Sequence, residues 1–263
     1  MAEPNPEELV DLGMLSYDKQ DFSKARKYFE RACGLNNGRG CNNLGVLYRD
    51  GQGVEKNLTK ADQLYTKACE LKEGVGCKRL WSLYYYGRGV EKNLTKATQY
   101  LSKACDLKYG RGCNDLGELY YNGEDVEKNL TKATQYFSKA CDLNNGGGCS
   151  NLGVLYQNGQ GVEKDLTKAA YLYSKACDLK EGLGCFNLGA LYYNGKGVEK
   201  DLIKAAYFYS KACELKEGYG CGALAVLYIN GQGVEKNLTK AAQYISKACK
   251  LGDQKACEAL KEK

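Results

Sequence analysis

Apolar side chains recur along this chain at helical spacing, and the same arrangement returns every 36 residues. Leu44, Leu47 and Tyr48 fall on one face of a predicted helix, here called helix A. A second apolar stripe, Ala61, Tyr65 and Ala68, predicts a helix B that begins near Leu58. The helix A triplet returns at 80/83/84, 116/119/120, 152/155/156, 188/191/192 and 224/227/228. The pattern therefore predicts amphipathic helix pairs in series.

Residues that begin and end helices stand at fixed places in each repeat. Asn57 occupies the N-cap position of helix B, and its column also holds Asp21, Asn93, Asn129, Asp165, Asp201 and Asn237. The Asn-Leu-Thr copies also match the N-glycosylation pattern, but aspartate shares only the capping ability, so capping is favoured. We expect positive φ at Gly51 and its repeats, and at the glycine column of the B-to-A turn. That column comprises Gly38, Gly74, Gly110, Gly146, Gly182 and Gly218.

A fixed period of this length indicates a stacked array, because each helix pair is too small to bury its own apolar face. We expect an all-α fold, an α/α solenoid of seven helix-hairpin repeats, forming a single domain over residues 1–263. The loop of the first unit is four residues shorter than the next. Residues 252–263 form a Lys/Glu-rich C-terminal capping helix.

Composition and charge narrow the class. With 43% hydrophobic and 27% charged residues and only two prolines, the chain is neither collagen-like nor disordered. No apolar run approaches the ~18 residues of a membrane span. The net charge of +6 is spread over interleaved Lys and Glu, which argues against nucleic acid and membrane partners. We expect a monomer.

Every cysteine belongs to a Cys-x7-Cys pair in the same register. Zinc sites favour closer spacings, usually with histidine, and the chain has none, so disulfides are favoured over metal. A separation of eight residues across a turn brings two sulfurs together, whereas longer pairings must cross the stack. Such cysteine usage predicts a secreted or periplasmic protein, with a signal peptide absent from this sequence. The predicted pairs are Cys33 with Cys41, Cys69 with Cys77, Cys105 with Cys113, Cys141 with Cys149, Cys177 with Cys185, Cys213 with Cys221, and Cys249 with Cys257.

Three motifs that recur in the helix pairs resemble those of a known repeat family. The Leu-Gly-x-Leu-Tyr helix, the Ala-x3-aromatic-x2-Ala helix and the Gly-x-Gly-Val insertion resemble Sel1-like repeats, relatives of the tetratricopeptide repeat. One Cys-x7-Cys per repeat narrows the resemblance to the Helicobacter cysteine-rich proteins. The resemblance implies a secreted right-handed α-superhelix. It also implies penicillin binding and slow β-lactamase activity, as assigned to some members, and host-cell interaction, as proposed for others.

Candidate catalytic chemistry is sparse. Ser16-Tyr17-Asp18-Lys19 is the one Ser-x-x-Lys element, and neither Ser-Asp-Asn nor Lys-Thr-Gly accompanies it. Without histidine there is no Ser-His or Cys-His pair, and paired cysteines leave no thiolate. We therefore expect no catalytic residue, no cofactor and no efficient enzyme. A weak penicillin-binding β-lactamase acting on a β-lactam or peptidoglycan-like molecule stays an alternative, as does a consensus-like engineered repeat protein without a ligand.

Helix B is nearly copied between repeats, whereas one face of helix A varies. In tetratricopeptide-like arrays that face lines a concave groove, and variation there is typical of a ligand site, although a tolerant solvated face gives the same pattern. We predict an extended peptide or protein partner. The predicted ligand residues are Asn43, Asn151 and Asn187 for peptide amides, Tyr85, Tyr121 and Tyr193 for contact area, and Lys78 and Arg79 for carboxylates.

Trp81 stands in a column otherwise held by glycine or alanine. A large ring there cannot share the close helix contact of its siblings. It predicts either local repacking or a role in recognition.

Overall fold

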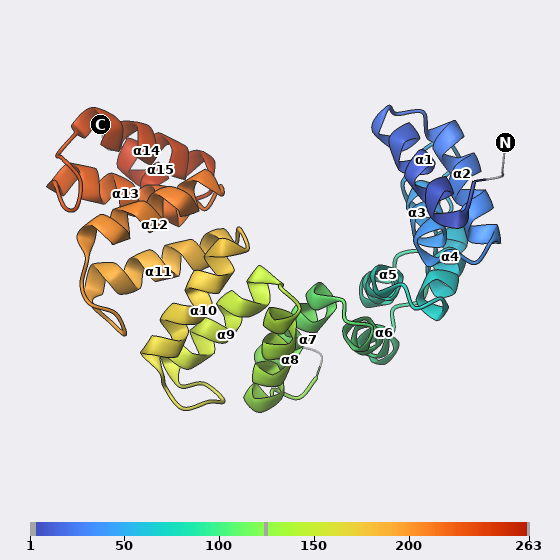
Figure 1. The fold of residues 1–263 in the computed structure, drawn as a ribbon, viewed down its shortest axis with the longest axis horizontal. Coiled ribbons are helices and arrows are strands. Elements are labelled where there is room, and N and C mark those ends of the chain that lie inside the picture. The colour runs from blue at the N-terminus through green and yellow to red at the C-terminus, as the bar shows by residue number, and fades with distance from the viewer. Residues whose placement is uncertain (1–3, 124–125, 262–263) are drawn as a thin grey trace. The chain divides into compact units, whose positions relative to one another are not determined.

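The computed structural model describes residues 4–123 and 126–261, and over these residues every regular element is a helix (Figure 1). The A helices are α1 (Pro6–Asp18), α3 (Gly38–Asp50), α5 (Gly74–Tyr86), α7 (Gly110–Asn122), α9 (Gly146–Asn158), α11 (Gly182–Asn194) and α13 (Gly218–Asn230). The B helices are α2 (Phe22–Gly34), α4 (Leu58–Glu70), α6 (Leu94–Asp106), α8 (Leu130–Asp142), α10 (Leu166–Asp178), α12 (Leu202–Glu214) and α14 (Leu238–Lys250). The capping helix α15 spans Gln254–Lys261. The predicted all-α hairpin array is confirmed.

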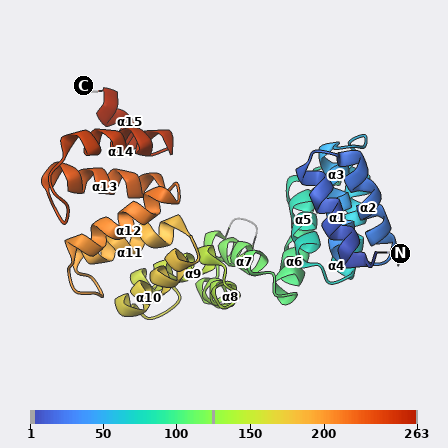
Figure 2. The same ribbon diagram turned by 45° about the horizontal axis from the view of Figure 1, so that its top comes forward.

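Two compact units make up the chain, Met1–Leu116 (unit 1) and Gly117–Lys263 (unit 2). Within each unit an A helix packs on its hairpin partner and on the B helix of the preceding repeat. In unit 1, α3 contacts both α4 and α2; in unit 2, α11 contacts both α12 and α10 (Figures 1 and 2). Each unit is thus a short α/α solenoid whose core is shared between neighbouring repeats.

Local chemistry fixes the hairpin ends. The Asn57 side chain accepts a hydrogen bond from the Lys60 amide at 2.8 Å, and all seven cap positions of the B helices show the same bond. Helix α3 ends at Gly51, which has φ of 71° as predicted.

The prediction for the B-to-A turn was wrong. Positive φ falls on non-glycine residues such as Asn36 and Lys72, two positions before the glycines. Gly38 instead begins α3, where a Cβ atom would lie 2.9 Å from the Glu73 Cβ of the next turn. These glycines therefore serve the close approach of successive turns rather than the reversal of the chain.

Disulfides join each hairpin to the helix that follows it. Every Cys-x7-Cys pair links the end of a B helix to the first turn of the next helix, with Cα atoms 4.5 to 4.7 Å apart. The pairing is the one that the spacing predicted. The bonded pairs are Cys33 with Cys41, Cys69 with Cys77, Cys105 with Cys113, Cys141 with Cys149, Cys177 with Cys185, Cys213 with Cys221, and Cys249 with Cys257.

The two cysteines of a pair lie in different surroundings. The second cysteine, on the A helix, is fully buried in six of the pairs, at Cys41, Cys77, Cys113, Cys149, Cys185 and Cys221. The seventh, Cys257, belongs to the capping helix α15 and is half-buried.

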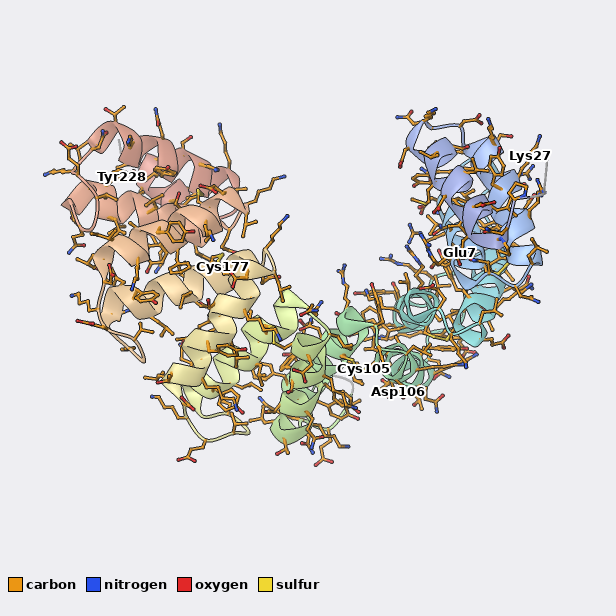
Figure 3. The ribbon with its side chains drawn as sticks, viewed as in Figure 1. Glu7, Lys27, Cys105, Asp106, Cys177 and Tyr228 are labelled. Carbon is orange, nitrogen blue, oxygen red and sulfur yellow. A yellow bond between two sulfur atoms is a disulfide. The ribbon has the colours of Figure 1, made fainter. Side chains whose placement is uncertain are left out.

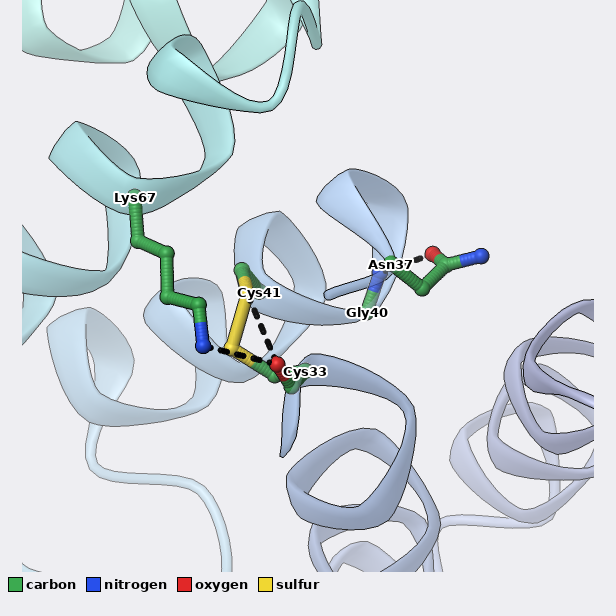
Figure 4. Close-up of a disulfide and its surroundings, with 5 residues drawn as sticks. All are labelled: Cys33, Asn37, Gly40, Cys41 and Lys67. Atoms are coloured by element: carbon green, nitrogen blue, oxygen red, sulfur yellow. Dashed lines mark hydrogen bonds between the residues drawn. A yellow bond between two sulfur atoms is a disulfide. The ribbon is translucent and has the colours of Figure 1, made fainter. Parts of the chain in front are cut away.

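Neighbouring repeats also support the stapled turns. Cys105 and Cys177, at the ends of α6 and α10, are equivalent members of two pairs (Figure 3). Beside the first disulfide, Lys67 of α4 donates to the Cys33 carbonyl oxygen at 2.9 Å (Figure 4). A side chain of the following repeat thus holds this turn.

The hairpin core rests on a pairing of small and large residues. A Cβ atom at Gly45 would lie 2.6 Å from the buried ring of Tyr65, so glycine in α3 makes room for an aromatic residue in α4. In the third repeat the sizes are exchanged, because Trp81 stands in the glycine column and Leu101 in the aromatic one. The Trp81 ring packs against Tyr85 of its own helix, with centroids 5.2 Å apart, and the predicted choice between repacking and recognition stays a prediction.

Candidate functional site

Unit 1 contains a pocket of about 600 Å³. Its lining comes from three consecutive repeats: the end of α3 and the loop after it, α4, α5 and the loop after it, and the turn that begins α7. The volume lies in the range of small-ligand sites. The A-helix residues in this lining include positions that vary between repeats, such as 49, 78 and 79.

Positive charge dominates the lining. It holds one carboxylate, Asp50, and six basic residues: Arg49, Lys56, Lys78, Arg79, Arg88 and Arg111. Two of the cations have acidic partners. Arg49 donates twice to Asp50, at 2.7 and 2.6 Å, and Lys78 Nζ lies 3.3 Å from an Asp115 oxygen. Among the described residues, the other four have no carboxylate within ion-pair distance.

The Arg79 side chain is held in place by a neutral neighbour. Its Nε donates at 2.9 Å to Oδ1 of the buried Asn42, and its guanidinium carbon lies 5.7 Å from the Tyr65 ring centroid. The terminal guanidinium nitrogens of Arg79 make no ion pair with a described residue. The basic residues also act on the Asp50 carboxyl. Its hydrogen bond to Arg49 lowers its pKa, and the Arg79 and Lys56 charges act in the same direction.

Tyr65 of α4 forms part of the pocket wall, and its hydroxyl is buried without a hydrogen-bond partner. Burial raises the pKa of this hydroxyl, whereas the Arg79 and Arg49 charges oppose the shift. The hydroxyl proton needs an acceptor, but an arginine side chain can only donate. The cations next to this hydroxyl, Arg79 and Arg49, therefore offer only donors, and the one carboxylate of the lining, Asp50, is already bonded to Arg49.

Of the predicted ligand residues in unit 1, Lys78 and Arg79 lie in this pocket and Asn43 and Tyr85 are not among its lining. The Asn43 amide contacts Met14 and accepts from Asn42 at 3.1 Å. The Tyr85 ring packs against Trp81, with centroids 5.2 Å apart.

The predicted residues of unit 2 lie on their A helices and are not part of the unit 1 pocket. The hydroxyls of Tyr121 and Tyr193 each donate at 3.4 Å to a glutamine in the A-to-B loop of the next repeat. Asn151 donates to Glu118 at 3.3 Å, and Asn187 is half-buried. Their role in binding stays a prediction.

Sequence reasoning did not single out Arg49, Arg88, Arg111 or Tyr65 as ligand residues. A signal existed, because basic residues at 49, 79 and 88 interrupt columns that are mostly neutral in other repeats. The pocket becomes visible only when residues about one repeat apart are placed side by side, as in a solenoid.

The surroundings of Ser16, the serine of the Ser-x-x-Lys element, do not support a catalytic role. Ser16 is buried, and its Oγ donates to the Leu12 carbonyl oxygen at 2.9 Å, which satisfies a helix rather than activating a nucleophile. Among the described residues, no cluster of three or more His, Cys, Asp or Glu is placed to hold a metal ion. Nor does any described helix have the length and apolarity that crossing a membrane requires.

The Sel1 repeat model matches seven successive segments, residues 13–37, 38–73, 75–109, 110–145, 147–181, 182–217 and 219–253. The chain belongs to the Sel1 repeat family. Its disulfide pairs also match the cysteine-rich Helicobacter proteins that the sequence resembles, which confirms that resemblance.

Relatives and solved structures agree with this placement. A 58-residue segment is 64% identical to "Putative beta-lactamase HcpC" of Helicobacter pylori strain J99; the match covers 22% of this chain and about a fifth (20%) of that relative. The structure of a Sel1 repeat protein from Oxalobacter formigenes is 26% identical, with a TM-score of 0.78 over 91% of this Sel1 chain and 96% of that one. The protective antigen c5321 of uropathogenic Escherichia coli, which displays an SLR fold, is 28% identical with a TM-score of 0.77, over 95% of this chain and 55% of that one.

Proposed function

We propose that this Sel1 repeat protein is a disulfide-stapled scaffold that binds an extended segment of a peptide or protein on the exposed faces of its A helices. The observation that carries the proposal is the unit 1 pocket, which three consecutive repeats build from variable A-helix columns. A surface that changes from repeat to repeat on a repeated frame is the arrangement by which solenoids recognise extended partners.

The frame supports such a role because it is made of repeated, buried parts. The capping asparagines and aspartates, the disulfides and the alanines of the B helices recur in every repeat. Ala61, Ala97, Ala133, Ala169 and Ala205 are fully buried. A rigid frame lowers the entropic cost of presenting the A-helix side chains to a partner.

We place this scaffold outside the cytosol, in the periplasm or the extracellular medium. Seven disulfides, with no free cysteine among the described residues, form and persist in oxidising compartments and are rare where thiols are kept reduced. The protein would therefore be exported and its disulfides formed before it binds a partner.

β-Lactamase activity, which the names of several relatives state for them, gains no support from the described residues. A serine enzyme needs a nucleophile beside a base and oxyanion donors. The buried Ser16 hydroxyl is committed to a backbone carbonyl instead.

Binding of an immobilised peptide array to the oxidised protein tests the proposal. We expect selected peptides to bind, and Arg79→Asn in unit 1 or Asn151→Ala in unit 2 to weaken at least one class of them. The matched controls Gln99→Ala and Gln135→Ala change exposed side chains on B helices and should leave binding intact. If the control variants weakened binding and the A-helix variants did not, the site would lie on the B helices and the proposal would fail.

A further inference from the structure

We propose that the unit 1 pocket binds an acidic peptide segment, with separate side-chain carboxylates meeting the arginines and one of them accepting the Tyr65 hydroxyl proton. This inference rests on the proposed function and names the chemistry of the partner. Three independent features carry it: the charge of the lining, the orphaned hydroxyl, and the equivalent positions of unit 2.

The first feature is an excess of fixed positive charge in a partly enclosed space. Six basic residues face one lining carboxylate, and that carboxylate is already taken by Arg49. Like charges brought together in a cavity repel one another, so the free protein bears a cost that an anionic ligand would remove. Arginine also binds carboxylates through two parallel hydrogen bonds, which adds geometric selectivity.

The second feature is the Tyr65 hydroxyl, buried in the pocket wall with no partner. Buried polar groups in proteins are almost always satisfied, so an exception within a pocket points to a missing ligand atom. Because its neighbours Arg49 and Arg79 are donors, the missing atom is an acceptor. A carboxylate oxygen meets both requirements, acceptor and negative charge.

The third feature is the contrast with the same positions in unit 2. Tyr173 stands in the column of Tyr65, and its hydroxyl donates at 3.1 Å to Gln157, which stands in the column of Arg49. Phe186 and Tyr219, in the columns of Lys78 and Arg111, pack against each other with ring centroids 6.0 Å apart. The frame thus accepts neutral residues in the columns of four of the six basic residues, so those four charges are not required for folding. Lys164 and Lys196 keep a positive charge in the columns of Lys56 and Arg88.

The spread of the charges favours a peptide over a single phosphate group. Arg79 lies seven residues before the last residue of α5, a distance of roughly 10 Å along the helix axis at 1.5 Å per residue, and Arg88 lies beyond that end. Alternate side chains of an extended peptide lie about 7 Å apart. Two or three carboxylates on such a segment match this separation, whereas one phosphate reaches only one end.

Fluorescence anisotropy of a capped peptide tests the proposal with the oxidised full chain. The probe carries three glutamates separated by single glycines, with both termini blocked so that only side-chain carboxylates are charged; the matched probe carries glutamine instead. We expect the glutamate probe to bind at least about ten-fold more tightly, because a charge-assisted hydrogen bond contributes more than a neutral one. Its affinity should also fall as salt rises.

Two variants assign the binding to this pocket. The triple variant Arg49→Gln, Arg79→Asn, Arg88→Gln introduces residues that the same columns hold elsewhere in this chain, and it should remove about ten-fold or more of the glutamate-probe affinity. Tyr65→Phe, which introduces the residue of Phe29 and Phe137, should weaken the same probe by up to about ten-fold without unfolding the protein. Unchanged circular dichroism in both variants would show that the fold is intact.

The other outcomes separate this inference from the proposed function. Equal binding of the two probes, or no binding of either while array peptides still bind, would overturn the acidic-peptide assignment and leave the scaffold role standing. If no peptide or protein bound in either experiment, both would fall. Displacement by tripolyphosphate at lower concentration than by the unlabelled glutamate peptide would assign the pocket to a phosphate ligand and overturn the proposal.

Discussion

The two units present the same frame with different A-helix faces. In unit 1 positions 49, 79 and 111 are arginine, and the Tyr65 hydroxyl has no partner. In unit 2 the equivalent positions are Gln157, Asn187 and Tyr219, and the Tyr173 hydroxyl is satisfied by Gln157. At these positions the unit 1 face is charged and has an unpaired hydroxyl, whereas the unit 2 face is neutral and its hydroxyl is paired.

This difference shows that the frame and the faces obey separate constraints. Caps, disulfides and buried alanines recur in both units because each repeat must stack on the next. The A-helix columns change chemistry without changing the helices that carry them, all of which are 13 residues long. Variation is therefore concentrated on A-helix positions where it costs the fold little.

The largest expected effect tests whether the frame is indeed common to both units. Closing an eight-residue separation contributes roughly 2.5 kcal/mol per disulfide in the chain-entropy model. Two paired variants, Cys69→Ala with Cys77→Ala and Cys177→Ala with Cys185→Ala, should each lower the free energy of unfolding by at least about this amount. Reduction of all seven should lower Tm far more.

Chemical denaturation of the two paired variants, under non-reducing conditions, provides the measurement. A clearly smaller loss for one of them would show that the staple does not hold the two units alike. An unchanged Tm after complete reduction would show that the disulfides contribute little to stability.

The next effect is a loss of stability at alkaline pH, and the group responsible, Tyr209, lies in unit 2. Burial, with the neighbouring Tyr193 charge, raises the pKa of Tyr209 from 10.0 to about 12. The folded state therefore holds a proton that the unfolded state loses, so stability is fully present below pH 10 and declines as the pH rises toward 12. The loss is on the order of 2 kcal/mol for this group.

Brief denaturant titrations between pH 9 and 12 measure that decline. Tyr209→Phe should make it less steep, with the remaining slope due to other buried tyrosines such as Tyr65 and Tyr173, whereas Tyr86→Phe, which changes a tyrosine 54% exposed, should not. The same slope in wild type and Tyr209→Phe would show that another group governs alkaline unfolding.

A third effect contrasts the repeat of Trp81 with the glycine-aromatic repeats. If Trp81 takes the space that a ring in α6 would fill, Leu101→Tyr should overpack the hairpin and lower the free energy of unfolding by about 1–3 kcal/mol. Adding Trp81→Gly should recover much of that loss, because Gly153 and Tyr173 already pair in this way. Additive losses in the double-mutant cycle would contradict the size exchange.

The fold could be predicted from the sequence because each determinant is local and repeated. Leu44, Leu47 and the Asn57 cap specify helices and their ends within a few residues, and seven copies remove ambiguity. The turn was predicted less well: Gly38 was assigned a positive φ, but the constraint on it is the next repeat's Glu73, which no local pattern reveals.

The candidate site was predicted only in part for the same reason. Lys78 and Arg79 stood out as carboxylate partners, but Arg49 and Arg111 join them from other repeats, 29 and 32 positions away in the chain. Nothing in the sequence indicated the unpaired Tyr65 hydroxyl, since the pattern predicts only that the tyrosine in that column is a buried core residue. Whether a buried hydroxyl finds an acceptor depends on side-chain positions that periodicity does not specify.

The smallest expected effect comes from removing one hydroxyl oxygen from each unit, which compares the two units most directly. Tyr65→Phe deletes a buried hydroxyl without a partner, so the free energy of unfolding should stay level or rise by up to about 1 kcal/mol. Tyr173→Phe deletes a hydroxyl that donates to Gln157 at 3.1 Å, so it should fall by about 1 kcal/mol. Urea denaturation of both variants at neutral pH measures the two changes, and circular dichroism checks that the helices are retained. Equal losses would mean that the Tyr65 hydroxyl is satisfied in solution, and the case for a missing acceptor in the unit 1 pocket would lose its strongest structural support.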